Sequence, residues 1–244
     1  MSEAGKLSKR LSLERIRAAG LEPRTVLDVG VATGTNGLYG VFPDARYALI
    51  EPLEESAPFM RALVDRYPGS VAVHAAAGRA AGTGELVVNA GLSGSSFLLK
   101  PAAGQVRTVP VVAIDDVIAE HGLEPPFVIK LDVQGYELEA LAGAEQALKH
   151  TIAVIAETSL WSDRKGKGMP TTLELMTWMQ ERGFVLYDIA QIVRRQLDGA
   201  VTELDLVFCP AASPLRAVAS YKSPEQLEGL IEKRRRAFGL SETP

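Results

Sequence analysis

Short apolar runs alternate along the chain with segments whose apolar residues recur at helical spacing. This alternation is typical of βαβ units, in which helices cover a mostly parallel sheet. The runs predicted as strands are 25–30, 45–51, 70–78, 127–132, 152–157, 184–190 and 203–209. Helices are predicted over 8–19, 53–67, 172–182 and 223–238. The pattern therefore predicts an α/β fold built on one sheet.

Residues 82–112 depart from this pattern, because they are rich in Gly and Ser and alternate like short antiparallel strands. We interpret them as a small β insertion on the sheet. The predicted organisation is then a helical extension over 1–24, one α/β domain over 25–210 and a helical tail over 211–244. The basic run 233–236 in the tail is predicted to be a solvated helix end, where positive charge is favourable.

Composition narrows the function classes. With 47% apolar and 23% charged residues the chain has enough material for a core, and its net charge of −4 gives no general attraction to nucleic acid. No window approaches the apolar length that spans a bilayer, and the one cysteine, Cys209, excludes an internal disulfide framework. We expect a cytoplasmic protein with no nucleic-acid partner and no membrane span. The oligomeric state is left open, and a homo-oligomer is compatible with the sequence.

The first candidate site follows the first predicted strand. VLDVGVATG places Asp28 at the end of that strand and Gly30 and Gly34 in the turn before an expected helix. Glycines allow a tight turn and let a ligand approach the backbone closely. The second strand ends at Glu51, where an acidic residue can accept hydrogen bonds from both ribose hydroxyls of a nucleoside cofactor. These four residues are therefore predicted to bind such a cofactor.

Two cofactor classes compete for this site. Nicotinamide enzymes usually carry G-x-G-x-x-G, which holds a pyrophosphate at a helix N-terminus. Here Gly30, Gly34 and Gly37 give G-x-x-x-G-x-x-G, so the close first pair is missing. The pattern matches the D-x-G-x-x-x-G of S-adenosylmethionine-dependent methyltransferases, and Asp28 suits a methionyl ammonium better than a pyrophosphate. S-adenosylmethionine is the predicted cofactor, and a nicotinamide-dependent oxidoreductase is the alternative.

A second candidate site lies in FVIKLDVQGYELEAL. Parallel strands end at a common rim, so Asp132 is predicted beside the cofactor, with Lys130 on the same face of the strand. The next strand brings Glu157 to that rim. The two carboxylates can bind a hydroxyl, act as a general base or share a divalent metal. A metal is the least favoured, because a third ligand is missing. Lys130 can pair with a carboxylate or extend to the rim.

With these motifs the chain resembles the FkbM-type methyltransferases. The resemblance rests on DVGVATG, IEP, LSGSSFL and above all IKLDVQGYELEALAGAE, and it covers about residues 25–210. It implies a class I Rossmann-like fold: a seven-stranded, mostly parallel sheet with helices on both faces and an antiparallel last strand. It also implies methyl transfer from S-adenosylmethionine, usually to a hydroxyl oxygen of a sugar, a glycan or lipid head group, or a polyketide-type natural product.

The resemblance also assigns roles to residues. Asp28 and Gly30 would bind the cofactor and Glu51 its ribose, whereas the substrate side would be formed by Ser95, Ser96, Lys130, Asp132, Gly135 and Glu137. One departure is the first loop, where Val31-Ala32-Thr33 replaces the family's more usual asparagine after the glycine. Glu137 is also predicted in the first turn of the helix after strand 127–132, and the favourable interaction of a carboxylate with that helix dipole can equally explain an acidic residue at this position.

The loop after Glu157 offers one more candidate. Trp161 lies in ETSLWSDRKGKGMPT, where it either packs against a sugar face as part of a lid or anchors a surface loop. We therefore predict Asp132 as the base or acceptor-orienting group, with Glu157 and Lys130 assisting and Trp161 binding substrate. A non-catalytic cofactor-binding module of the same fold is the second alternative.

Overall fold

The central strands are short, mainly apolar and buried, as expected of parallel strands covered on both faces. The computed structural model describes residues 7–35, 37–92, 94–100, 104–161, 169–218 and 220–240, which form two compact units divided after Ser213. In the first unit, β1 (Thr25–Val29) pairs in parallel with β2 (Arg46–Ile50) and with β7 (Phe127–Leu131), and β7 pairs with β8 (Thr151–Ser159).

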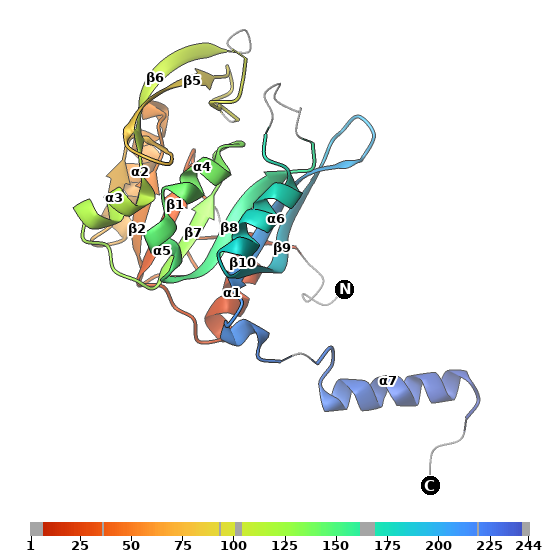
Figure 1. The fold of residues 1–244 in the computed structure, drawn as a ribbon. Coiled ribbons are helices and arrows are strands. Elements are labelled where there is room, and N and C mark those ends of the chain that lie inside the picture. The colour runs from red at the N-terminus through yellow and green to blue at the C-terminus, as the bar shows by residue number, and fades with distance from the viewer. Residues whose placement is uncertain are drawn as a thin grey trace. The chain divides into compact units, whose positions relative to one another are not determined.

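Three further strands complete a seven-stranded sheet in the order β3-β2-β1-β7-β8-β10-β9. β3 (Val71–Val73) pairs in parallel with β2, whereas β10 (Val201–Pro210) runs antiparallel to both β8 and β9 (Phe184–Arg194). The predicted seven-stranded, mostly parallel sheet with an antiparallel last strand is thus confirmed. Figure 1 shows β9 and β10 as a long hairpin at the side of the sheet opposite β2.

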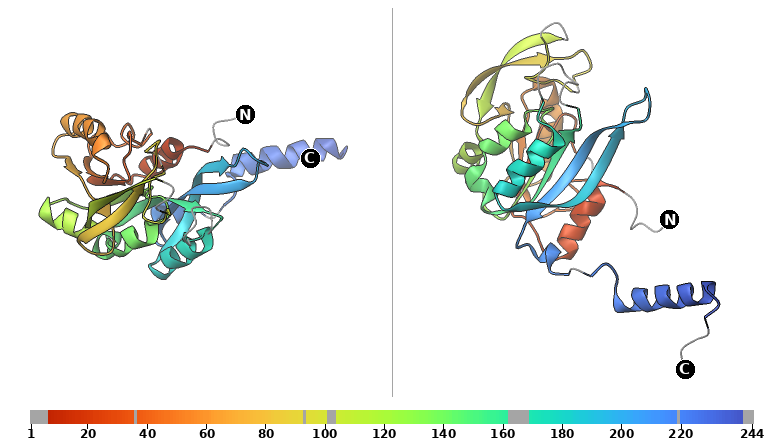
Figure 2. Two further views of the ribbon diagram at one scale, coloured as in Figure 1. Left: turned by 90° about the horizontal axis from the view of Figure 1, so that it is seen from above. Right: turned by 45° about the vertical axis from the view of Figure 1, so that its right-hand side comes forward.

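Helices cover both faces of this sheet. In the view from above, α1 (Lys9–Ala18) and α2 (Ala57–Arg66, preceded by the 3₁₀ turn Glu54–Ser56) lie on one side (Figure 2). The other side carries α3 (Ile114–Glu120), α4 (Glu137–Ala142), α5 (Glu145–Leu148) and α6 (Thr172–Glu181). The main core forms where the apolar residues of α3 to α6 meet the strands, and it includes Leu27, Ile129, Leu141, Met179 and Phe208.

The run 70–78, predicted as one strand, divides between two sheets. Its first part is β3, whereas Ala76–Ala77 forms β4 of a three-stranded sheet, β4-β6-β5. In that sheet β5 (Gly82–Val88) and β6 (Gln105–Val112) are antiparallel, and β4 is parallel to β6. The small sheet has a core of its own, formed by Leu53, Ala76, Leu86, Val88 and Val109. The segment after β3 therefore leaves the central sheet to build a second one.

A second difference concerns the chain after the first glycine loop. The expected helix there is wrong, because residues 37–45 form turns that lead directly into β2. The turns are held by the hydroxyl of Tyr47, which donates to the carbonyl oxygens of Tyr39 and Phe42. The glycine loop over 30–35 is consequently followed by turns, and these offer no helix N-terminus at which a pyrophosphate could bind.

The second unit contains the 3₁₀ turn Pro214–Arg216 and the helix α7 (Pro224–Ala237). α7 begins with a capping box between Ser223 and Gln226. Its last turn holds Arg234, Arg235 and Arg236, and positive charge at this end of a helix interacts favourably with the helix dipole. Within the described part of the chain, none of the helices combines the length and apolar character that crossing a bilayer requires.

Candidate active site

A buried ion pair joins the two central strands. Lys130 lies opposite Asp28 in the register of β1 and β7, and its Nζ is 3.1 Å from Asp28 Oδ1. The same ammonium donates to the carbonyl oxygen of Gly30 at 2.7 Å and lies 3.9 Å from Asp132 Oδ2. Burial opposes the charge of Lys130, but the carboxylates of Asp28 and Asp132 outweigh it and raise the pKa of Lys130 above its usual value. Lys130 is therefore a permanent cation beneath the rim of the sheet.

Asp28 is completely buried, and its carboxylate is engaged by the protein. It accepts hydrogen bonds from the hydroxyls of Tyr39 and Thr35 in addition to its pair with Lys130. Since the Tyr39 hydroxyl also accepts from the backbone N–H of Thr35, these contacts fix the loop that follows β1. Asp28 thus holds the loop that follows β1 and lines neither of the two cavities at this rim, which are described below.

Gly30 occupies a position that only glycine fits. Its φ is +80°, and a Cβ built there would lie 2.0 Å from the carbonyl oxygen of Asp132. The N–H of Gly30 donates to the carbonyl oxygen of Ile50, and the N–H of Asp132 donates to that of Val29. The ends of β1, β2 and β7 are thus drawn together at this glycine. Gly34 has a φ of +99° and closes the loop by donating to Val31.

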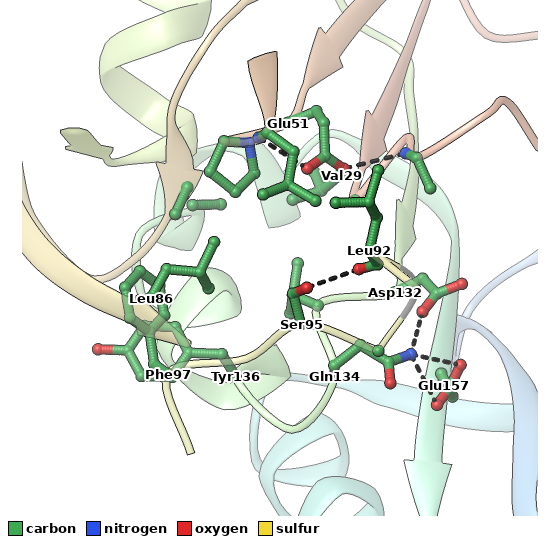
Figure 3. A pocket seen from close by; sticks show the side chains of 18 of the residues that line it. Val29, Glu51, Leu86, Leu92, Ser95, Phe97, Asp132, Gln134, Tyr136 and Glu157 are labelled. Carbon is green, nitrogen blue, oxygen red and sulfur yellow. Dashed lines mark hydrogen bonds between the residues drawn. The ribbon is translucent and has the colours of Figure 1, made fainter. Parts of the chain in front are cut away.

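Glu51 follows β2 and points into the site (Figure 3). Its Oε2 accepts from the N–H of Ala32 at 2.9 Å and its Oε1 from that of Leu53 at 3.0 Å. Burial raises the pKa of Glu51, and the two N–H donors partly oppose that effect. Because a carboxylate oxygen has two lone pairs, each oxygen can still accept another hydrogen bond. The side chain is therefore held in place with capacity for a ligand hydroxyl.

A cluster of two carboxyl groups and one amide lies across the cavity from Glu51 (Figure 3). The side-chain nitrogen of Gln134 is 2.7 Å from Asp132 Oδ1 and 3.2 and 3.3 Å from the two oxygens of Glu157. Gln134 has a φ of +56°, a conformation that is strained for a residue with a Cβ. The hydroxyl of Ser96 donates to the carbonyl oxygen of Gln134 at 2.8 Å, which helps hold Gln134 in that conformation.

The two carboxyl groups differ in protonation. Burial acts to raise the pKa of Asp132, but the charge of Lys130 and the hydrogen bonds from Gln134 and Glu157 lower it overall. Burial and the charge of Asp132 raise the pKa of Glu157 well above its usual range. At neutral pH Asp132 is therefore ionised while Glu157 keeps its proton, a separation of roles that is common in acid–base sites.

Glu137 is buried behind the loop between β7 and α4. Its Oε1 accepts from the N–H groups of Val133 and Gly135 at 3.2 and 3.1 Å. Burial raises the pKa of Glu137 to about 7 in spite of these bonds. Glu137 stabilises the loop that carries Gln134 and lines neither of the two cavities at this rim.

Two cavities open at this rim, of about 690 and 480 Å³. Of the predicted residues, the larger is lined by Gly30, Glu51, Ser95, Asp132 and Glu157. The smaller is lined by Gly30, Gly34, Lys130 and Asp132. The structure thus brings together most of the predicted donor-side and acceptor-side residues. The predicted residues that line neither cavity are Asp28, Ser96, Gly135, Glu137 and Trp161.

The paired serines have different positions. Ser95 lines the larger cavity and donates to the carbonyl oxygen of Leu92 at 2.6 Å. Ser96 is buried and holds Gln134. Trp161 lies at the surface, where its indole N–H donates to Val201 at 3.1 Å and Arg195 stacks 4.3 Å from a ring centroid. Most of the lid predicted after Trp161, residues 162–168, lies outside the described residues.

Sequence reasoning missed Gln134 and Lys9. The signal for Gln134 was its place two residues after a strand-end acid and directly before a glycine, in LDVQG. Lys9 begins α1 and lines the smaller cavity, although it lies well before the first strand in the sequence. Among the described residues, no group of three or more His, Cys, Asp or Glu side chains is arranged to hold a metal ion.

A family model described as "Methyltransferase FkbM domain" matches residues 28–186, which is more than half of the chain. The chain belongs to the FkbM methyltransferase family. Membership supports S-adenosylmethionine-dependent methyl transfer as the activity class. The matched residues run from Asp28, at the buried ion pair, into β9. The FkbM domain of this chain thus contains every predicted catalytic and cofactor-binding residue.

Solved structures similar to this FkbM methyltransferase include the N-methyltransferase NodS from Bradyrhizobium japonicum WM9 in complex with S-adenosyl-L-homocysteine. Its identity is 12% and its TM-score 0.45, over 83% of this chain and 85% of that one. WbdD is 18% identical with a TM-score of 0.46, over 82% of this chain and 39% of that one. The 23S rRNA methyltransferase ErmE is 19% identical with a TM-score of 0.40, over 93% and 77%. None of the three bears on the acceptor. No curated protein matches the chain.

The ion pair between Lys130 and Asp28 generates a prediction about stability. Lys130→Met leaves the Asp28 carboxylate buried without its cation, so we expect the free energy of unfolding to fall by about 3–5 kcal/mol. Adding Asp28→Asn to that variant removes the negative charge that has lost its partner. The double variant should therefore be more stable than the sum of the two single losses predicts, as measured by urea denaturation. Additive losses would show that the two groups are not coupled.

Glu137 generates a prediction about pH. Its folded-state pKa of about 7 exceeds the ordinary 4.5, so the stabilisation linked to its proton is complete below about pH 4.5 and is lost as the pH rises through 7. Glu137→Gln cannot ionise. Between pH 5 and pH 8 the wild type should lose up to about 3 kcal/mol of unfolding free energy relative to this variant. The partly exposed Glu139→Gln on the same helix is the control; if Glu137→Gln parallels the wild type at every pH, the assignment fails.

Proposed function

We propose that this chain methylates a hydroxyl oxygen of a small hydroxylated acceptor, such as a sugar, a glycan or a natural product, with S-adenosylmethionine as the donor. The observation that carries the proposal is the position of the Asp132 carboxylate, which lies 3.9 Å from the Lys130 ammonium and faces a cavity whose opposite wall holds Glu51. A nucleoside and a hydroxylated molecule can both occupy a cavity of about 690 Å³.

The residues around Glu51 fit the donor. The carboxylate of Glu51 is placed to accept hydrogen bonds from ribose hydroxyls, with Ala32 and Leu53 fixing its orientation. The wall beside it is apolar and suits a purine ring; it consists of Ile50, Pro52, Leu53, Ala76, Ala77 and Leu86. When bound, the donor supplies a sulfonium methyl group that is already activated for displacement.

Asp132 is the proposed acceptor-binding group. Its ionised carboxylate can accept the hydrogen bond of an acceptor hydroxyl, which aims an oxygen lone pair into the cavity, and can take the proton when the oxygen–carbon bond forms. Gln134 fixes the rotamer of Asp132 through the 2.7 Å hydrogen bond. Glu157, protonated beside it, removes a second negative charge from the cavity.

Lys130 and Asp28 act through other groups in this proposal. Lys130 keeps Asp132 ionised and holds the carbonyl oxygen of Gly30, so it sets both sides of the site without contacting the acceptor. Asp28 fixes the position of Lys130 and of the loop. Substrate contacts by Ser95 and Trp161 stay predictions.

The structure does not favour the nicotinamide-dependent oxidoreductase alternative. A nicotinamide dinucleotide needs a helix N-terminus to bind its pyrophosphate, but residues 37–45 after the glycine loop form turns. The methyl-transfer experiment below distinguishes an enzyme from a non-catalytic module of the same fold.

Donor binding gives the first test. Glu51→Ala should weaken S-adenosylhomocysteine binding about 10- to 100-fold in calorimetry, because the ribose hydroxyls lose a buried carboxylate acceptor. Glu54→Ala, at an exposed glutamate three residues later, is the matched control and should bind like the wild type. If the wild type does not bind S-adenosylhomocysteine, the proposed donor is wrong.

Asp132→Asn gives the second test. The variant should bind S-adenosylhomocysteine within about threefold of the wild type, whereas transfer of a radiolabelled methyl group to hydroxylated acceptors should fall at least about 100-fold, because Asn cannot take the proton. The acceptor panel combines sugars, glycosides and hydroxylated polyketides. A wild type that binds the donor product but methylates no member of the panel supports the non-catalytic module.

A further inference from the structure

The two cavities at the rim are neighbours. Gly30, Ala32, Asp132 and Gln191 line both of them, so the cavities adjoin at the end of β1. A ligand held at Glu51 in the larger cavity would reach the smaller one past Gly30.

The two cavities differ in chemistry. Beyond Glu51 the wall of the larger cavity is apolar, whereas the smaller cavity is lined by two cations, Lys9 and Lys130, and one carboxylate, Asp132, together with Ser8 and Thr35. S-adenosylmethionine has the same polarity, with a flat base at one end and an amino acid at the other. The charged amino-acid end would therefore occupy the smaller cavity.

The two cations differ in their capacity to bind a ligand. The side chain of Lys130 is only 3% exposed, and its ammonium already contacts Gly30, Asp28 and Asp132. Lys9 has a side chain that is 19% exposed, and its Nζ forms an ion pair with Asp205 Oδ2 at 2.9 Å. An ammonium has three donors, so Lys9 can contact a second carboxylate from this position.

We propose that Lys9 binds the α-carboxylate of the amino-acid part of the methyl donor. The inference rests on the proposed donor and deepens it, because it places a residue of α1, outside the family-matched residues 28–186, in the donor site. Asp205, on β10, then serves to hold Lys9 over the smaller cavity. A competing explanation is that Lys9 only attaches α1 to the sheet.

The experiment compares two ligands that differ in the amino acid. S-adenosylhomocysteine carries it, and 5′-methylthioadenosine has the same nucleoside without it. Lys9→Met should weaken S-adenosylhomocysteine binding about 10- to 100-fold by calorimetry and change 5′-methylthioadenosine binding less than about threefold. Arg10→Met, at an exposed neighbouring cation paired with Glu14, is the matched control and should change neither affinity.

A second pair of variants guards against a folding defect, since Lys9→Met strands the Asp205 carboxylate. Asp205→Asn keeps Lys9 but removes its ion pair, so it should weaken S-adenosylhomocysteine binding less than Lys9→Met does and leave 5′-methylthioadenosine binding within about threefold of the wild type. Adding Lys9→Met to it should produce the full selective loss. Equal weakening of both ligands, or no change in either, in the Asp205→Asn background overturns the role of Lys9. If the wild type binds 5′-methylthioadenosine but Lys9 variants keep full S-adenosylhomocysteine affinity, this inference fails while the proposed donor survives. If the wild type binds neither ligand, both the role of Lys9 and the proposed donor are wrong.

Discussion

The structure around the site depends on one buried cation. Lys130 sits between two carboxylates and a carbonyl oxygen at the point where β1 and β7 end. A charge in that position is costly unless it is fully paired, so the lengths and register of both strands are constrained to bring its partners within reach. The same constraint brings Gly30 against the backbone of Asp132 and leaves that carboxylate ionised at the rim. Fold and chemistry thus share one set of contacts.

Much of the fold and of the site could be predicted from local sequence pattern. Short, mainly apolar runs locate the central strands. The two-residue period of a strand places Lys130 and Asp132 on one face, in agreement with the 3.9 Å between Lys130 Nζ and Asp132 Oδ2. The partner of Lys130 could not be derived in this way. Asp28 lies far earlier in the chain, and its contact with Lys130 depends on β7 being the neighbour of β1, a fact of strand order that no local pattern contains.

Other features escaped prediction for equally physical reasons. The run 70–78 is uniformly small and apolar, so nothing in it marks the point where the chain passes from β3 to β4. The turns after the glycine loop depend on hydroxyls from Tyr47 and Tyr39, which are supplied by tertiary contacts. The strained conformation of Gln134 is supported by Ser96, a residue of the insertion whose hydroxyl donates to the carbonyl oxygen of Gln134. For Glu137 the sequence left open a substrate contact or a role at the helix start; in the structure its Oε1 accepts hydrogen bonds from the N–H groups of Val133 and Gly135, which no sequence pattern indicates.

The separate core of the three-stranded sheet has a consequence for how this enzyme class can diversify. One wall of the larger cavity carries Leu86 and Phe97, which pack with Val88 and Val109 in a cluster distinct from the one beneath the central strands. Phe97 lines the larger cavity but is not part of the wall proposed for the purine, so substitutions at Phe97 reshape the space offered to an acceptor without disturbing the strands that hold Lys130. Selection, or a protein engineer, can therefore vary recognition and methyl-transfer chemistry on two largely independent sets of side chains.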